Sequence, residues 1–562
     1  MPRVKAVATL YSLSLNRITS ILKTSNIPVN VERSIQQAID SESESEINPF
    51  HRIPTTLLED IINFLPINQT ATKPFNIEFL ITTELQKLIF PRYPCRFFCY
   101  EYEQYLNFFP KLEKLQVLVL PNTNVDDLCL KLIGTFCKKL RILDVNACSK
   151  VSDIGVEWLV NQSSPELSKT LRELLIACPD VTKKGIQMAI QHFSALQVVE
   201  SVHIFEVLVE VLQSAALAQH PPQILKVSFT RLKITIDASR ELFKSSNFEL
   251  VMKFCPSLLD ITISVHKELT DTDLFCLTNV KNLQKLKIYS NKNSDEAEIT
   301  FNKGLAPVLK VIGSSLKVLD LSYFEFVDIW TIAKFCPNLI FLNFENQCQS
   351  SGALSENETI QLRNEFGRVI FKELKVLVCG FNLTKDILFD LLSCPSLENV
   401  YIGFCNALTD DFLEDAISRN IFNNLKILRL KSCNFVTKQG LDGLVKSDND
   451  FEQMGFFFCD KITRVHFDEW LKFARHKNWQ ISNLLDRLKA DCEDHLIRRM
   501  SPENCIQLLL NADQQNAIED LIAGALEFFR LHQRQVMITD SWKKAKKGNP
   551  VKLCEIQEVL HL

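Results

Sequence analysis

A short pattern recurs along most of the chain, with apolar side chains at the first, fourth and sixth positions of each copy. Ten copies are visible. They begin at Leu115, Leu140, Leu171, Leu258, Leu283, Leu316, Leu339, Leu374, Leu397 and Leu425. The spacing from Leu115 to Leu140 is 25 residues, and it recurs from Leu258 to Leu283. Such regular spacing predicts short strands that stack in a repeat array.

Each predicted strand is followed by a turn and then a helical stretch. In the segment NACSKVSDIGVEWLV, Ser152 or Asp153 is placed to cap a helix, and we expect this helix to carry Ile154, Trp158 and Leu159 inward. A single strand–helix copy cannot bury its own apolar face. Stacked copies share one core, so the strands are expected to line a concave surface and the helices to form the convex back.

Cysteines recur in step with the repeats. Cys148, Cys405, Cys433 and Cys459 fall eight residues after the first apolar residue of a strand, and Cys178 falls seven after it. A second set follows the helices: Cys137, Cys255, Cys336 and Cys394. A zinc site needs close clustered pairs, whereas cysteines one repeat apart are expected to stack as small core residues. We therefore expect no metal ligands among them.

This cysteine pattern resembles the leucine-rich repeats of F-box/leucine-rich-repeat ubiquitin ligase receptors and of the PRAME family, over about residues 110 to 465. The resemblance implies an α/β fold, a leucine-rich-repeat solenoid of the cysteine-containing type. Two stretches break the period, 199 to 250 and 345 to 370. The first is interpreted as a longer convex helix and the second as a surface loop, either of which is a tolerated insertion or a recognition element.

Two amphipathic helices are predicted ahead of the repeats, separated by the acidic, serine-rich linker 41–49. Taken alone, such helices cap the exposed end of a solenoid. The first, in residues 1–40, resembles an elongin-binding BC-box through Thr9, Leu10 and Ile18, with Ser14 where cysteine is usual. The second, in residues 50–70, resembles an F-box or a cullin-box. The resemblance implies that a docking face lies outside the stacked core, formed by Leu10, Ile18, Ile53, Pro54, Leu57, Ile61 and Leu65.

The remaining boundaries divide the chain into a transition at 71–110, the repeats at 111–470 and an all-α segment at 471–562. This last segment resembles the BACK-type region that follows the BTB domain in speckle-type POZ proteins, through NLLDRLKADCEDHL and SPENCIQLLLNADQQNA. In that family the region helps to bind a cullin and supports dimers. The body of a BTB domain is absent from this sequence, so we expect no dimer of the BTB kind.

Composition and charge narrow the function classes. The chain has 63 basic and 67 acidic residues, a net charge of −4, which favours neither nucleic acid nor a membrane as partner. No apolar run is long enough to span a bilayer, and the 18 cysteines without a secretion signal favour a reducing compartment, cytoplasmic, nuclear or both. No phosphate-binding loop, zinc-protease motif or nucleophile elbow occurs. We therefore expect no enzyme activity and no cofactor.

Two functions remain open. The first is a substrate-recognition subunit of a cullin-RING ubiquitin ligase, with an elongin or Skp-type linker, a cullin and a protein target as partners. The alternative is a leucine-rich-repeat scaffold that has no ligase association. Binding energy at such surfaces resides in a few anchors. The candidate anchors, by strand register alone, are Asn146, Tyr289, Tyr323, Asn343, Tyr401 and Arg429.

Overall fold

A computed structural model gives the structure of the chain. It describes residues 53–64, 80–90, 106, 108–217, 228–235, 245–264, 269–289, 299–322, 324, 327–344, 370–380, 383–422, 424–446, 451–463, 465–466, 469–470, 480–483, 505–506, 529, 536–537 and 539–548. The chain divides into two units, Met1–Leu397 and Glu398–Leu562. Each unit is described by itself.

The first unit is a ladder of parallel strands that pair in chain order, each strand with the next. The strands are β1 (Lys87–Ile89), β2 (Val117–Val119), β3 (Ile142–Asp144), β4 (Glu173–Leu175), β5 (Val198–Glu200), β6 (Arg231–Thr235), β7 (Asp260–Ser264), β8 (Lys285–Tyr289), β9 (Val318–Ser322), β10 (Phe341–Phe344) and β11 (Val376–Gly380). This order, with a helix between most pairs, is the architecture of a leucine-rich-repeat-like solenoid.

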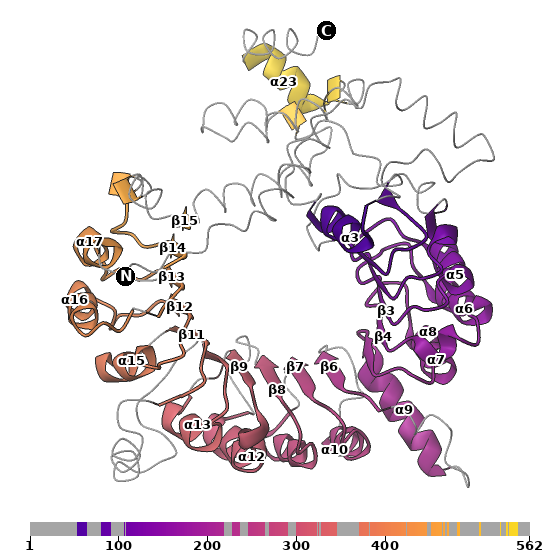
Figure 1. Ribbon diagram of the computed structural model, residues 1–562, viewed down its shortest axis with the longest axis horizontal. Helices are drawn as coiled ribbons and strands as arrows, with labels where there is room; N and C mark the ends of the chain where they lie inside the picture. The colour runs from indigo at the N-terminus through magenta and orange to yellow at the C-terminus, as the bar shows by residue number, and fades with distance from the viewer. Residues whose placement is uncertain are drawn as a thin grey trace. The chain divides into compact units, whose positions relative to one another are not determined.

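Most helical segments of the first unit connect consecutive strands, while the first precedes β1 and the last follows β11. They are α3 (Thr55–Phe64), η5 (Phe109–Lys111), α5 (Asp127–Phe136), α6 (Asp153–Gln162), α7 (Leu167–Thr170), α8 (Lys183–His192), α9 (Ile204–Leu217), α10 (Ser245–Phe254), α11 (Asp271–Leu274), η7 (Phe275–Asn279), η8 (Phe301–Leu305), α12 (Ala306–Ile312), η9 (Gly313–Ser315), α13 (Ile329–Phe335) and α15 (Lys385–Leu392). Figure 1 shows α5, α6 and α8 together on one side of β3 and β4. The other side of the sheet, which the helices leave open, is called the strand face below.

The second unit continues the same repeat design. Its elements are β12 (Asn399–Gly403), α16 (Asp410–Ser418), β13 (Ile427–Lys431), α17 (Lys438–Lys446), β14 (Gln453–Phe457), β15 (Gln480–Asn483) and α23 (Asp540–Gly548). The strands β12 to β15 are parallel and pair in chain order. In this unit α16 and α17 lie on one side of the strands (Figure 1). The predicted α/β repeat fold is therefore confirmed in both units.

Register aligns the fourth-position apolar residues of successive repeats. Leu118 pairs with Leu143, and Leu143 pairs with Leu174; in the second unit Val400 pairs with Leu428. The side chains of Leu118, Leu143 and Leu174 have no exposed surface. Because each of these leucines contacts its equivalents in the flanking repeats, the core is a continuous apolar column inside the array.

The strand ladder extends beyond the predicted repeat boundaries of 111–470. β1 lies in the predicted transition, where Leu85, Leu88 and Phe90 occupy the first, fourth and sixth positions of a further copy and are all buried. At the other end, β15 pairs with β14 inside the stretch predicted to be helical from about 470. The predicted break at 199–250 contains the expected helix α9, but it also contains a paired strand, β6. The predicted loop at 345–370 lies, apart from its last residue, outside the described residues.

The helix register differs from the expectation at α6. Ser152 caps α6 as predicted, with its hydroxyl accepting a hydrogen bond from the Ile154 amide. However, Ile154 is 54% exposed and Trp158 is 36% exposed, so only Leu159 of the three residues points inward. The buried face is instead made by Gly155, Val156 and Leu159. The prediction for Ile154 and Trp158 was therefore wrong.

A carboxylate ladder explains this rotation of α6. The side chain of Asp127, the first residue of α5, accepts hydrogen bonds from the Ser152 amide and the Ser152 hydroxyl, both at 2.7 Å. Asp153 does the same for Thr182 in the following repeat, at 2.8 and 2.6 Å. A side chain at Gly155 would clash with Asp127, whose Cα lies 2.9 Å from an added Cβ. The helix therefore turns its glycine toward the carboxylate.

The cysteines form the predicted ladder through weak hydrogen bonds from their thiols. The Sγ atom of Cys148 lies 3.2 Å from the Leu120 carbonyl, and that of Cys178 lies 3.1 Å from the Val145 carbonyl, in each case one repeat back. Of the thirteen cysteines in the described residues, twelve are buried and Cys276 is partly exposed; none forms a disulfide. Burial raises the pKa of Cys137 to about 12.

The burial of these thiols predicts slow labelling of the native protein. A thiol reagent attacks the thiolate, and a raised pKa leaves almost no thiolate at neutral pH. We expect native protein to react slowly with a chromogenic disulfide reagent and denatured protein to release close to 18 equivalents without prior reduction. Fast native labelling of many cysteines would contradict the thiol ladder.

Candidate functional site

The helix α3 closes the N-terminal end of the strand ladder. Its residues Leu58, Ile61 and Ile62 are each only 1% exposed, and the helix packs against β1. The carboxylate of Glu59 accepts hydrogen bonds at Oε1 from the amides of Gln86 and Lys87, both at 2.9 Å. The helix is thus part of the packed array, contrary to the expectation that it lies outside it.

Glu59 reproduces a hydrogen-bond pattern that a preceding strand would otherwise supply. In the next repeat, the Gln86 carbonyl accepts from the amides of Gln116 and Val117, at 2.8 and 3.0 Å. In the first repeat the Glu59 side-chain oxygen takes the place of that carbonyl. An open strand edge carries unsatisfied amides that invite pairing with another chain. The Glu59 carboxylate therefore ends the ladder at β1.

The predicted docking residues divide into three groups in the structure. Pro54 is exposed, and Ile53 and Leu57 are partly exposed, at the beginning of α3. Ile61 is buried against the array. Leu10, Ile18 and Leu65 lie outside the described residues. The structure thus leaves Ile53 and Pro54, just before α3, and Leu57, in its first turn, at least partly accessible, and it assigns Ile61 to packing.

The strand face of the first unit carries charged residues that pair across neighbouring strands. Arg231 of β6 lies 3.5 Å from both Glu173 of β4 and Asp260 of β7, and Lys285 of β8 lies 3.9 Å from Asp260. Two residues further along the strands, Lys233 forms an ion pair with Glu200 at 3.1 Å. The two signs alternate across these strands, so this face has no broad field of either charge.

Asp320 of β9 forms the centre of a polar cluster on the same face. Tyr289 donates a hydrogen bond to its carboxylate at 3.1 Å, Asn343 donates at 2.8 Å and Ser322 at 3.3 Å. Burial raises the pKa of Asp320 above its ordinary value, although these hydrogen bonds and the charge of Lys287 act in the opposite direction. Burial and the nearby carboxylates raise the pKa of Tyr289 to about 12, so its phenol remains a donor.

Of the candidate anchors in the first unit, Tyr289 and Asn343 therefore meet at one carboxylate and are partly exposed. Asn146 is 9% exposed, and its Oδ1 accepts a hydrogen bond from the Ala177 amide at 2.7 Å. It follows β3 rather than lying in it, and it joins two repeats. Strand register, which made Asn146 a candidate anchor, was therefore wrong for this residue. Tyr323 lies outside the described residues.

In the second unit, the candidates Tyr401 and Arg429 are direct neighbours across β12 and β13. The Nη2 atom of Arg429 donates to Gln453 of β14 at 3.0 Å. The ring of Tyr401 stacks on that of Phe457, with centroids 6.3 Å apart and an angle of 18° between planes. Arginine and aromatic residues are the types most often found at interface hot spots. Tyr401, Arg429 and Phe457 thus form a group on the strands of the second unit, as the Asp320 cluster does in the first.

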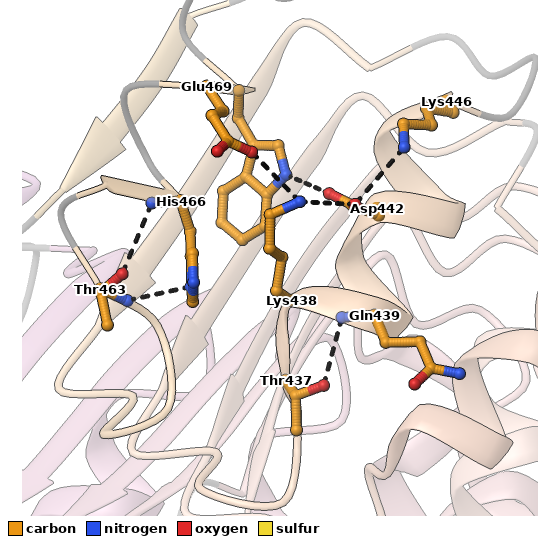
Figure 2. A network of polar contacts seen from close by, with 9 residues as sticks. Thr437, Lys438, Gln439, Asp442, Lys446, Thr463, His466 and Glu469 are labelled. Atoms are coloured by element: carbon orange, nitrogen blue, oxygen red, sulfur yellow. Dashed lines mark hydrogen bonds and ion pairs between the residues drawn. The ribbon is translucent and has the colours of Figure 1, made fainter.

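A second polar network is centred on Asp442, in the middle of α17 (Figure 2). The Asp442 carboxylate accepts from the Trp470 indole at 2.8 Å and pairs with Lys438 at 2.7 Å and Lys446 at 3.4 Å. Trp470 also packs on Phe456, with ring centroids 5.3 Å apart. Although burial acts to raise the pKa of Asp442, the hydrogen bonds from Lys438, Trp470 and Lys446 lower it overall.

This network predicts a pH-dependent contribution to stability. Because the folded pKa of Asp442 is depressed, its carboxylate stabilises the fold above the unfolded pKa of about 4, and the contribution is lost as the pH falls through the folded value. We expect Asp442→Asn to lower the melting temperature at pH 7 and to have a smaller effect near pH 3. A difference from wild type that grows toward acid pH would contradict this assignment.

Two observations on the described residues concern a metal site and a membrane span. There, no group of three His, Cys, Asp or Glu side chains is arranged to hold a metal ion. Nor, within those same residues, is any helix long and apolar enough to cross a membrane. The described surfaces carry polar, aromatic and charged side chains on a repeat scaffold.

Two structural features of the repeats were not predicted from the sequence. One is Glu59, whose role depends on β1, a strand that was assigned to the transition segment. The other is the Asp127-type ladder, which recurs as Asp271 to Thr300 and Asp410 to Thr437. Its sequence signal is a serine or threonine cap followed three or four residues later by glycine, one repeat after an aspartate.

No family model matches the sequence. Among solved structures, the chain is similar to one in the crystal structure of the yeast Rad7 and Elc1 complex, with a TM-score of 0.31 and 14% identity over 83% of this chain and 91% of that one. It is also similar to a chain of the mouse RP105/MD-1 complex, with a TM-score of 0.30 and 13% identity over 72% of this chain and 80% of that one. The leucine-rich-repeat-like architecture stands on the strand pairing and helix packing of the chain itself.

Proposed function

We propose that the protein is the substrate-recognition subunit of a cullin-RING ubiquitin ligase. In this proposal the N-terminal helices engage an elongin or Skp-type linker and a cullin, and the strand face binds the target protein. The subunit itself performs no catalysis. Its free, buried cysteines suit a reducing compartment, so the proposed site of action is the cytoplasm or the nucleus.

The observation that supports this proposal is the division of α3 into two faces. Leu58, Ile61 and Ile62 hold the helix on β1, and Glu59 ends the ladder. The other side leaves Ile53, Pro54 and Leu57 accessible. A helix that is fixed by one face holds the accessible apolar residues at its start in place for a partner groove. They are three of the four positions that match the cullin-box-like pattern; the fourth, Ile61, is buried.

A scaffold without ligase association is the second candidate, and one observation favours it. The burial of Ile61 and Ile62, together with the two hydrogen bonds to Glu59, is sufficient to explain α3 as a cap alone. On this view the accessible residues of α3 have no partner, and the strand faces bind other proteins without recruiting a cullin.

Two substitutions within α3 separate the candidates. Leu57→Asp places a charge on the accessible face, so the receptor proposal predicts loss of linker and cullin from purified complexes with little change in melting temperature. Ile61→Ala removes a buried side chain and should cost about 2 to 5 kcal/mol of stability. The measurement is co-purification of elongin, Skp-type linker and cullin with each variant, alongside thermal unfolding.

Only a receptor is expected to give this combination of co-purification and stability results. A scaffold would show no linker or cullin with the wild type and only the stability loss for Ile61→Ala. A wild type that retains these partners, and a Leu57→Asp variant that retains them equally, would instead show that docking does not use the accessible face of α3.

A further inference from the structure

In several repeats, the turn after the strand contains one residue in the left-handed backbone region. In five repeats this residue immediately precedes a ladder cysteine or its equivalent: Asn122, Ala147, Phe404, Ser432 and Phe458, with φ between 50° and 59°. The turn is needed to continue the ladder, since the amides of Phe404 and Ser432 donate to the Lys431 and Phe457 carbonyls, both at 2.7 Å. Backbone geometry therefore requires positive φ at this position.

Phenylalanine is a poor choice for such a turn. Glycine and, less often, asparagine or aspartate accommodate positive φ, whereas for a bulky side chain it is a genuine outlier. Asn122 follows this preference, whereas Ala147 and Ser432 are small but still carry a Cβ. Phe404 and Phe458 are the two bulky residues at this position, and both lie in the second unit. Strained residues of this kind cluster at binding sites, where another requirement outweighs the backbone cost.

Burial does not account for the ring at position 458. Phe458 is 53% exposed, and Phe435, which lies in the turn of the intervening repeat, is 51% exposed. Phe404 is partly exposed. The strands β12, β13 and β14 are parallel, so the turns that follow them lie along the same edge of the sheet. These three phenylalanines are called the aromatic row below.

Lysines accompany the aromatic row. The ammonium group of Lys431 lies 5.4 Å from the centroid of the Phe404 ring, and that of Lys461 lies 5.8 Å from the centroid of the Phe435 ring. Both distances are within the range of cation–π attraction. The carboxylate of Asp460, the acidic residue of these turns, accepts a hydrogen bond from Asn434 at 2.6 Å. The aromatic row thus combines exposed rings with positive charge.

Spacing indicates an extended partner. Neighbouring strands are about 4.8 Å apart, so the turns of β12 and β14 are separated by about 10 Å, the length of three residues in an extended chain. Two lysines are too few for a nucleic-acid surface, which usually neutralises about 6 to 10 phosphates. An acidic segment with apolar side chains matches both the rings and the ammonium groups.

We propose that the aromatic row of Phe404, Phe435 and Phe458, with Lys431 and Lys461, is a docking surface for an extended acidic segment of a partner protein that carries apolar side chains. Rings of the row contact the apolar side chains of the segment, and the ammonium groups contact its carboxylates. The surface is independent of α3 and of any ligase association.

The test uses the full chain and fluorescence anisotropy. The probe is a labelled peptide in which glutamate alternates with phenylalanine and leucine; a second peptide has lysine in place of glutamate, and a labelled oligothymidylate represents single-stranded nucleic acid. Wild type is expected to bind the acidic peptide in preference to both others. Phe458→Asn is expected to weaken this binding about tenfold, equivalent to about 1.4 kcal/mol, and Lys461→Glu to shift the preference toward the lysine peptide.

Stability measurements distinguish binding from packing. Asparagine tolerates positive φ, so Phe458→Asn should leave the melting temperature unchanged or raise it. The matched control is Phe275→Asn, which changes a 56% exposed phenylalanine of the first unit and should not affect peptide binding. Four results would overturn the proposal: no preference of wild type for the acidic peptide, preference for the oligonucleotide, unchanged binding by Phe458→Asn, or a lower melting temperature for that variant.

Discussion

Replacing Leu143 with aspartate is expected to disrupt the fold of the first unit. Leu143 has no exposed surface and stacks between Leu118 and Leu174 of the flanking repeats. An unpaired carboxylate there has no hydrogen-bond partner and no access to water, so the expected loss exceeds about 4 kcal/mol. Since folded proteins are stable by only about 5 to 15 kcal/mol, we expect loss of cooperative unfolding by circular dichroism.

Two further variants make this result interpretable. Leu143→Ala leaves a cavity without a charge and should cost about 2 to 5 kcal/mol. Arg141→Asp introduces the same charge two residues earlier at an exposed position, and its effect should remain within about 0.5 kcal/mol. If Leu143→Asp melted like wild type, the assigned strand register would be incorrect.

Replacing Gly440 with valine is expected to destabilise the second unit by about 1 to 3 kcal/mol or more. The carboxylate of Asp410 reaches across to the cap residue Thr437, whose amide donates to it at 2.8 Å. An added Cβ at Gly440 would meet this carboxylate, with Leu413 Cδ1 only 3.0 Å and Asp410 Cα 3.1 Å away. The side chain would separate α17 from α16 and break the hydrogen bonds of the ladder.

A second glycine of the same helix provides the control. Gly443 has a single neighbour, Ile417 Cδ1, at 3.4 Å from an added Cβ, which is ordinary contact. Gly443→Ala should therefore be neutral or stabilise by up to about 1 kcal/mol, because alanine favours the helix. Chemical denaturation of Gly440→Val and Gly443→Ala measures both. Equal effects would show that the carboxylate ladder does not require a glycine.

The strands were predictable because their period is short and their core is shared. Leu118, Leu143 and Leu174 each sit at the fourth position of a copy, and a shift of one residue would expose every one of them. The cysteine ladder followed from the same register. Because the pattern recurs in many copies, each copy supports the same strand register. A single strand would provide only one such observation.

Helix orientation was less predictable, because a repeat helix is oriented by contacts with its neighbours. Ile154 and Trp158 have the spacing of a buried face, but Asp127 of the previous repeat draws Gly155 to the interior. Similarly, the apolar face of α3 could be read as docking or capping until β1 was found beneath it. Amphipathic spacing identifies an apolar face without identifying what covers it.

The positions of the candidate anchors were likewise only partly predictable from the sequence. Strand register placed Tyr289 and Asn343 on one face, and both hydrogen bond to Asp320. It failed for Asn146, which lies two residues beyond the end of β3 and bonds to the next repeat instead. Polar side chains at strand ends serve either the ladder or the surface, and only the tertiary contacts distinguish the two.

The most direct test of the proposed receptor function is quantitative affinity purification of the intact wild-type chain under gentle lysis. The proposal predicts that an elongin or Skp-type linker and a cullin are retained in amounts comparable to the chain itself, and that the Leu57→Asp variant retains neither. Cooperative thermal unfolding shows whether the wild-type chain is folded. If the folded chain retains no elongin, Skp-type linker or cullin, the result contradicts the receptor function and favours the scaffold.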